Sequence, residues 1–293
     1  IDLIHGPAPS VDRVPLIPIR AFREAVMAME PPLGQQVQKP VLFESSGTTG
    51  QRRSRHQVRD PRLYVRSVLR GFRRFYGPSH SPVMGYLPGY LDNPRSSLVA
   101  MLRILDGARP GPGIHGDPDQ ALRSLHAWRD RPIMLFGAAF GLLDLVERAR
   151  GGMPALAPGS VVIETGGMKT HRREIPRDQL HRRLSDGLGV APEQVHSEYS
   201  MCEMLSQAYC RDGEWFEPVP WLKFQVRDPD RPLRACTPGE EGKLGFIDLT
   251  NVHSCSFVLT DDRAVADGQG RVKIMGRWER APSRGCNYMV DKD

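Results

Sequence analysis

The chain has 293 residues, which rules out a peptide-sized scaffold and fits one large domain or a large domain with a small appendage. Apolar residues make up 40% and charged residues 25%, so wholesale disorder and a fibrous repeat are excluded. The formal net charge of +6 permits acidic ligands such as nucleotides, but it is too dispersed to indicate a nucleic-acid-binding face.

Two further classes are disfavoured. The most apolar stretch, residues 133–146, contains two glycines and Asp144, so we expect no membrane span. The chain begins with an isoleucine and shows no secretion signal, and we expect that residues are missing upstream. The cysteines are odd in number and form no CxxC pair, which disfavours a zinc ribbon or a disulfide framework and favours the reducing cytoplasm. They are Cys202, Cys210, Cys236, Cys255 and Cys286.

The residue pattern predicts three regions. Residues 1–40 hold seven prolines and one short amphipathic segment, 21–29, and are expected to form a lead-in over a domain surface. Residues 41–212 alternate short apolar runs with helical periodicity, which predicts an α/β nucleotide-binding core with a largely parallel sheet and flanking helices. Residues 213–293 alternate short strands with turns and are expected to form a smaller β-rich subdomain. The strand candidates are 41–43, 83–87, 133–136, 161–163, 221–226, 243–249, 256–259 and 272–275.

The clearest helix is expected at residues 61–76, where apolar residues recur at helical spacing along one face. A second helix is indicated by Leu180, Leu184 and Leu188. The opposite face of the first helix carries five arginines, which we interpret as a solvated face, with an acidic protein partner as the alternative. They are Arg62, Arg66, Arg70, Arg73 and Arg74.

The sharpest local motif, residues 44–50, reads Glu-Ser-Ser-Gly-Thr-Thr-Gly directly after an apolar strand. Hydroxyls and backbone N–H groups beside two glycines can all point at one anion, so this loop can wrap a polyphosphate. The spacing of a Walker loop is absent, and a plain Gly/Ser turn remains the alternative.

Three later stretches add to this loop: Glu-Thr-Gly-Gly at 164–167, Ser-Glu-Tyr-Ser-Met-Cys-Glu at 197–203, and Thr-Asp-Asp at 260–262 followed by Gly-Arg at 276–277. Their order resembles the adenylate-forming superfamily of acyl-CoA synthetases, adenylation domains and firefly-type luciferases. Within it the chain is most similar to the acyl-protein synthetases of the bacterial luminescence fatty acid reductase. The similar segments run from about residue 43 to 290 and also include 54–56, 71–77, 196–209, 255–262 and 284–286.

The resemblance implies an ATP and Mg²⁺ site. Gly166 and Gly167 would line the adenine pocket with Tyr199 against the base, and Ser200 and Cys202 would belong to the same site. The β- and γ-phosphates would be held by Ser45, Ser46, Gly47, Thr48, Thr49 and Gly50.

The resemblance also implies the catalytic groups. Glu203 would hold Mg²⁺, Asp262 would bind the ribose hydroxyls, and Arg277 would reach the ribose or α-phosphate. A carboxylic acid would be converted to an acyl-AMP and then to a thioester. Cys286, with Arg284 beside it, would be the acyl acceptor of a carboxyl-terminal tail, and an acyl-accepting protein or reductase would be the partner.

Several features depart from the superfamily. Its usual Tyr-Gly-x-Thr-Glu is here Tyr-Ser-Met-Cys-Glu, and its Thr-Gly-Asp is Thr-Asp-Asp. Only 16 residues follow Arg277, so we expect the chain to lack the usual swivelling carboxyl-terminal domain and its catalytic lysine. Lys169 or an arginine in 52–55 is the candidate replacement.

Alternative interpretations stay open. An acyl- or aryl-CoA ligase and a catalytically silent nucleotide-binding regulatory module both fit parts of the pattern. Cys286 also fits a buried small side chain. His56 and His196 are candidate bases, but lone histidines beside strands favour a structural role. The cysteine spacing gives little support to a metal site.

Overall fold

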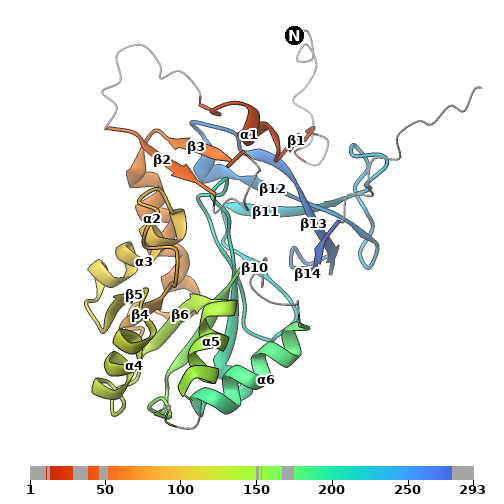
Figure 1. The fold of residues 1–293 in the computed structure, drawn as a ribbon. Helices are drawn as coiled ribbons and strands as arrows, with labels where there is room; N and C mark the ends of the chain where they lie inside the picture. Colours follow the sequence, from red (N-terminus) through yellow and green to blue (C-terminus); the bar gives the residue numbers. More distant parts are fainter. Residues whose placement is uncertain are drawn as a thin grey trace, which may run out of the picture.

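The structure is a computed structural model, and it describes residues 11, 14–28, 39–45, 52–149, 152, 154–166 and 175–278. Two sheets form most of it, with a short hairpin beside them. Figure 1 shows the larger sheet and its helices in the lower part of the molecule, and the second sheet above and to the right. The functional question is what gathers where the two sheets meet.

The larger sheet has seven strands in the order β10-β9-β8-β7-β6-β4-β5, and all pairs from β8 to β5 are parallel. The expected largely parallel sheet is confirmed. At one edge β9 and β10 add antiparallel pairs. The strands are β4 (Val83–Tyr86), β5 (Gly113–His115), β6 (Met134–Ala138), β7 (Val161–Thr165), β8 (Val195–Tyr199), β9 (Ala208–Cys210) and β10 (Glu217–Pro218).

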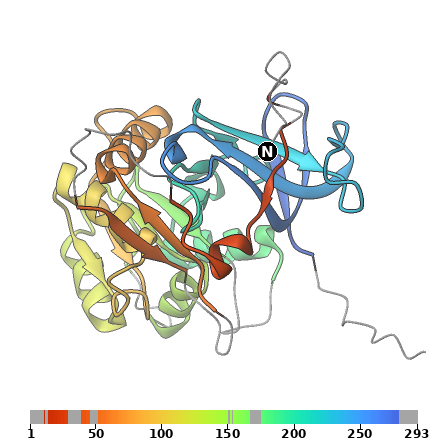
Figure 2. The ribbon, with the colours of Figure 1, turned by 90° about the horizontal axis from the view of Figure 1, so that it is seen from above.

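Helices cover this sheet on both sides. Figure 2 shows α2 and α3 on one side and α4 and α5 on the other, and α6 packs against α5. Crossovers between parallel strands are normally right-handed, so the direction of a crossover along the sheet decides which face its helix covers. The connection from β4 to β5 runs in the opposite direction from the connection from β6 to β7, and their helices therefore lie on opposite faces. Ligands of such sheets bind beyond the carboxyl ends of the strands. The helices are α2 (Pro61–Tyr76), α3 (Ser97–Ala108), α4 (Pro118–Ala127), α5 (Ala139–Ala149) and α6 (Arg177–Leu188), with the 3-10 turn η2 at Pro192–Gln194.

Helix α2 has the bounds that its amphipathic pattern predicts. Asp60 caps its first turn by accepting a hydrogen bond from the Arg62 backbone N–H, and Pro61 fits the first helical position because it needs no N–H partner there. Gly77 ends the helix with a φ of +78°, a conformation that side chains disfavour. The buried face of α2 packs on the sheet, while its arginines are exposed.

The second sheet is antiparallel, apart from one parallel strand from the amino-terminal region. Its order is β1-β13-β12-β11, and β14 pairs with the far half of β13. The expected β-rich region is therefore present, although β10 belongs to the larger sheet. The elements are β1 (Ile17–Pro18), β11 (Leu222–Arg227), β12 (Glu241–Asp248), η3 (Leu249–Asn251), β13 (Phe257–Ala266) and β14 (Val272–Arg277). The domain bounds 1–40, 41–212 and 213–293 stay a prediction.

The amino-terminal region and the hairpin complete the fold. The amphipathic segment 21–29 forms only one helical turn, α1 (Ala21–Glu24), because Ala25 is already extended. Its Phe22 is fully buried and meets the ring of His56 edge-on. That histidine lies on β3 (Arg55–Val58), which pairs with β2 (Val41–Glu44) and so brings the two ends of segment 44–55 together.

The core is continuous across both sheets, and five of its large side chains lie on or beside β4 and β6. They are Met84, Tyr86, Leu87, Phe136 and Phe140. Among the described residues, no helix is both long and apolar enough to cross a membrane.

Two helical glycines test how closely α5 and α6 pack. A Cβ added at Gly107 in α3 would meet nothing within 4 Å, whereas one at Gly187 in α6 would overlap Val146 Cγ1 and lie 3.0 Å from its Cγ2. Gly107→Ala is therefore expected to raise the free energy of unfolding by about 1 kcal/mol. Gly187→Ala gains the same helix propensity but overpacks α5, and is expected to lower it by about 1–2 kcal/mol.

Urea unfolding of both variants measures these changes. A Gly187→Ala variant that is stabilised as much as Gly107→Ala would contradict the close packing of α5 on α6.

Candidate active site

Three of the residues predicted to bind nucleotide form one cluster where the two sheets meet. The Tyr199 hydroxyl donates to Asp262 Oδ2 at 2.7 Å, and Arg277 Nε donates to Asp262 Oδ1 at 3.1 Å. Tyr199 ends β8 of the larger sheet, while Asp262 and Arg277 are direct partners across β13 and β14. Side chains 63 positions apart in the sequence are thus joined through one carboxylate.

The cluster leaves hydrogen-bonding capacity for a ligand. Each Asp262 oxygen uses one lone pair in these contacts and keeps another that can accept from a hydroxyl. The Arg277 side chain is 63% exposed and contributes only Nε to the contact with Asp262. Burial, followed by the Asp262 charge, raises the pKa of Tyr199, so its hydroxyl stays a neutral donor.

A second group of predicted residues lies a few residues further along the same segment. The Cys202 thiol donates to Glu203 Oε2 at 3.2 Å, and both residues are buried. Cys202 Sγ also lies 3.9 Å from the Ser54 carbonyl oxygen. Ser54 in turn exchanges hydrogen bonds with Ser45, whose hydroxyl accepts from the Ser54 N–H at 3.0 Å. The start of the predicted phosphate loop is therefore adjacent to Cys202 and Glu203.

Segment 200–207 has no helix or strand, and three buried side chains from elsewhere fix its backbone. His56 Nδ1 donates to the Cys202 carbonyl at 2.7 Å, and Asn251 Nδ2 donates to the Glu203 carbonyl at 2.8 Å. Asp248 accepts from the Leu205 N–H at 2.8 Å and from the Ser206 hydroxyl at 2.6 Å. These contacts set where Glu203 stands.

The two candidate bases, His56 and His196, are engaged in other contacts. A carbonyl only accepts, so His56 carries its proton on Nδ1 and its Nε2 accepts from the Ser254 hydroxyl at 2.8 Å. His196 contacts the Tyr76 hydroxyl and the Glu193 carbonyl. Burial lowers the pKa of each to about 4, so both stay neutral, and their contacts favour structural roles.

A buried carboxyl, Glu198, was not singled out from the sequence. It neighbours Tyr199, is 3% exposed, and accepts a hydrogen bond from the Thr165 hydroxyl, one residue before Gly166. Burial raises the pKa of Glu198 to about 7. The sequence gives no signal for it, because Val-His-Ser-Glu-Tyr at 195–199 is not an apolar run and is not among the expected strands.

On the other face of the same strands, Ser197, His181 and Glu164 are close together but do not form a nucleophile–base relay. His181 Nε2 lies 3.1 Å from Ser197 Oγ and 3.5 Å from Glu164 Oε1. A relay needs the two contacts on different ring nitrogens, whereas here one nitrogen makes both.

Several predicted residues lie outside the part of the chain that the structure describes. These are Ser46, Gly47, Thr48, Thr49, Gly50, Gly167, Lys169, Arg284 and Cys286. Gly166, at the end of β7, has a φ of +73°, which favours glycine. Within the described part, no three His, Cys, Asp or Glu side chains are placed to hold a metal ion.

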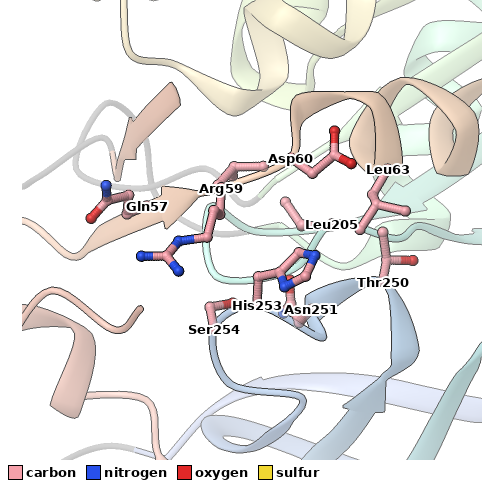
Figure 3. Close-up of a pocket in the computed structure, with 10 residues that line it drawn as sticks. Gln57, Arg59, Asp60, Leu63, Leu205, Thr250, Asn251, His253 and Ser254 are labelled. Carbon is pink, nitrogen blue, oxygen red and sulfur yellow. The ribbon is translucent and has the colours of Figure 1, made fainter. Parts of the chain in front are cut away.

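A small hollow borders segment 200–207 at Leu205. Figure 3 shows it under the start of α2, between Arg59 and Asp60 on one side and His253 and Ser254 on the other. Its lining includes Leu205 and Asn251 but none of the predicted nucleotide-binding residues. The hollow therefore borders the contacts that hold Glu203, and it is separate from the Tyr199 cluster.

Solved structures show the class of fold. ATP-bound MatB from Rhodopseudomonas palustris superposes with a TM-score of 0.57 at 19% identity, covering 80% of this chain and 47% of that one. A 2-hydroxyisobutyryl-CoA ligase, solved in the postadenylation state, gives 0.61 at 17% identity, covering 90% of this chain and 58% of that one. The fold is that of the adenylate-forming ligases, and the chain spans about half the length of these neighbours.

Sequence comparison is more specific. A 134-residue stretch is 27% identical to the long-chain-fatty-acid–luciferin-component ligase of Vibrio harveyi, covering 43% of this chain and 35% of that protein. The family model for acyl-protein synthetase, LuxE, matches residues 121–293. The chain therefore belongs to the LuxE acyl-protein synthetase family, as its sequence resemblance predicts.

The buried Glu198 carboxyl predicts a pH dependence of stability. Its pKa rises from 4.5 to about 7 on folding, so between these values the unfolded chain releases a proton that the folded chain keeps. Stability is therefore lost as the pH rises through this window, by up to about 3 kcal/mol. Glu198→Gln removes this contribution. The unfolding free energy of the variant relative to the wild type should increase by up to that amount between about pH 5 and about pH 8.

Urea unfolding across the pH range measures this difference, with the exposed Glu193→Gln as the matched control. If the difference in unfolding free energy between Glu198→Gln and the wild type did not change with pH, the raised pKa of Glu198 would be contradicted.

Proposed function

We propose that this chain catalyses ATP-dependent activation of a carboxylic acid through an acyl-AMP, followed by transfer of the acyl group to a cysteine thiol. The observation that carries the proposal is the joining of Tyr199, Asp262 and Arg277 beside the segment that presents Glu203. Membership of the LuxE family supports it. The adenylate-forming fold supports the use of ATP.

The contacts suggest how the nucleotide would be held. Asp262 would accept hydrogen bonds from the ribose hydroxyls, since both of its oxygens keep an unused lone pair. The adenine would lie against Tyr199, whose ring is already packed edge-on by Phe216 and Phe224 at 5.9 and 6.1 Å. The phosphates would then extend toward Ser45 and Glu203, along the direction of segment 199–203.

The first step brings anions together. A carboxylate oxygen attacks the α-phosphorus, the bond between that phosphorus and the bridging oxygen breaks, and pyrophosphate leaves. Arg277 can offset charge on the α-phosphate because its terminal nitrogens extend beyond its contact with Asp262. Binding in this arrangement also orients the two reactants, which lowers the entropic part of the barrier.

Glu203 suits a magnesium site of the kind that a nucleotide completes. Mg²⁺ favours oxygen ligands and often takes one or two carboxylates together with phosphate oxygens, so a single buried carboxylate fits this donor set. When bound there, the ion would supply charge neutralisation for the leaving pyrophosphate. The Cys202 thiol, which donates to Glu203 Oε2, holds the carboxylate in place meanwhile.

The second step forms a thioester. A thiolate sulfur attacks the acyl carbon, the carbon–oxygen bond to AMP breaks, and the thiol proton passes to solvent. Cys286 is the proposed acceptor, and it lies outside the described residues. Three cysteines of the described part are poorer candidates. Burial raises the pKa of Cys210 to about 12 and raises the pKa of Cys236 and Cys255 as well, which disfavours the thiolate.

A CoA ligase is the second candidate, because the neighbour with the 0.61 TM-score is a 2-hydroxyisobutyryl-CoA ligase. In that case coenzyme A, rather than a protein thiol, would accept the acyl group. The cytoplasmic location and the acyl-accepting partner protein stay predictions.

Exchange of labelled pyrophosphate into ATP, driven by a panel of fatty, aryl and amino acids, tests the adenylation step. Asp262→Asn should raise the KM for ATP about tenfold or more, because it weakens hydrogen bonds to a charged acceptor. Asp261→Asn is the matched control, since Asp261 directly precedes Asp262 on β13 and is exposed. It should change the KM by about twofold at most.

No exchange with any acid would contradict adenylation and favour a silent nucleotide-binding module. Equal effects of the two aspartate variants would remove Asp262 from the nucleotide site.

Intact mass spectrometry identifies the acceptor. After incubation with ATP and an acid that drives exchange, the chain should gain one acyl group, and Cys286→Ser should abolish the gain while leaving the exchange rate unchanged. An adduct that persists in Cys286→Ser would contradict this acceptor. An acyl group found only on added coenzyme A would favour the CoA ligase.

A further inference from the structure

The Glu198 carboxyl has no role in the chemistry proposed above, although its residue directly precedes Tyr199 on β8. Its Oε2 accepts a hydrogen bond from the Thr165 hydroxyl. Its other oxygen, Oε1, is buried and has no hydrogen-bond partner among the described residues. A carboxyl in this state is costly to bury, so its presence calls for an explanation.

The hydrogen-bond partner of Glu198 identifies what it joins. Thr165 is the last residue of β7 and directly precedes Gly166, while Glu198 itself directly precedes Tyr199 at the end of β8. Thr165 and Glu198 are register partners across the two parallel strands. The Glu198 carboxyl therefore links the ends of β7 and β8, one residue before Gly166 and one residue before Tyr199.

Sheet stability alone does not require this connection. The strands β7 and β8 are already paired along four residues, and Val162 and Val195, which begin that pairing, are apolar. An apolar side chain at position 198 would avoid the cost of burying a carboxyl. What the carboxyl adds is a side-chain link at the last pair of the two strands, one residue before Gly166 on β7 and one residue before Tyr199 on β8.

The ionisable side chains around Glu198 are one carboxyl and three tyrosines. The carboxyl is that of Glu164, whose negative charge acts on Glu198. Glu164 directly precedes Thr165 on β7, and its side chain contacts His181. Tyr209 faces Glu198 from β9, and Tyr64 and Tyr76 approach from α2. Burial raises the pKa of all three tyrosines, so they remain neutral beside the carboxyl.

We propose that Glu198 is a positioning residue of the nucleotide site, which sets the separation of Gly166 from Tyr199 by holding Thr165. Gly166 and Tyr199 are the two walls between which the adenine is proposed to lie, so the inference rests on the proposed function. Glu198 itself need not touch the nucleotide. Loss of the link should weaken recognition of the base and spare recognition of the phosphates, whose proposed ligands stand elsewhere.

Isothermal titration of the full chain with ATP and, separately, with inorganic tripolyphosphate tests this separation. Thr165→Val keeps the shape of the side chain but removes the hydroxyl, and Thr165→Ser keeps the hydroxyl. Thr165→Val should weaken ATP binding about five- to tenfold, as expected for one lost hydrogen bond, whereas Glu198→Gln, whose amide oxygen can still accept from Thr165, should bind ATP like the wild type. Tripolyphosphate binding should stay unchanged in all variants, and Thr165→Ser should bind ATP like the wild type.

The two threonine variants carry the test even if Glu198→Gln folds poorly. ATP binding by Thr165→Val equal to that of the wild type would overturn the proposal. Equal weakening of ATP and tripolyphosphate would also overturn it, because it would indicate a general structural role. A wild-type chain that binds neither ligand contradicts the proposed function itself, and the inference then falls with it.

Discussion

Segment 200–207 depends on other parts of the chain for its shape, because it lacks the repeating hydrogen bonds of a helix or strand. Buried backbone groups must be paired, and here His56, Asn251 and Asp248 provide the pairing. They come from β3, η3 and the end of β12. The position of Glu203 is therefore decided by contacts between segments far apart in sequence rather than by local propensity.

The same constraint makes the site a property of the contact between the two sheets. The larger sheet contributes Tyr199, and the smaller one contributes Asp262 and Arg277. Movement of one sheet relative to the other would separate the ring proposed to face the base from the carboxylate proposed to hold the ribose. Asp248 reinforces the junction, since it ends β12 yet binds Leu205 and Ser206 in the segment that follows β8.

The sequence predicts those parts of the fold that repeat a local pattern. Helix α2 has the expected bounds because its apolar face recurs at helical spacing and Asp60 and Gly77 mark its ends. Strand β3 has no such pattern, since its Arg-His-Gln-Val is mostly polar and only tertiary contacts bury His56. The family resemblance predicts the residues that meet at Asp262, but it does not predict Glu198, because burial of a carboxyl is invisible in a sequence.

The central claim is that one nucleotide is held by groups from both sheets. A crystal structure of the chain with a non-hydrolysable ATP analogue and Mg²⁺ tests it most directly. The account predicts ribose hydroxyls within hydrogen-bonding distance of Asp262, the base against Tyr199, and the ion on Glu203. A nucleotide bound elsewhere, with the Tyr199–Asp262–Arg277 contacts undisturbed and solvent around them, would contradict it.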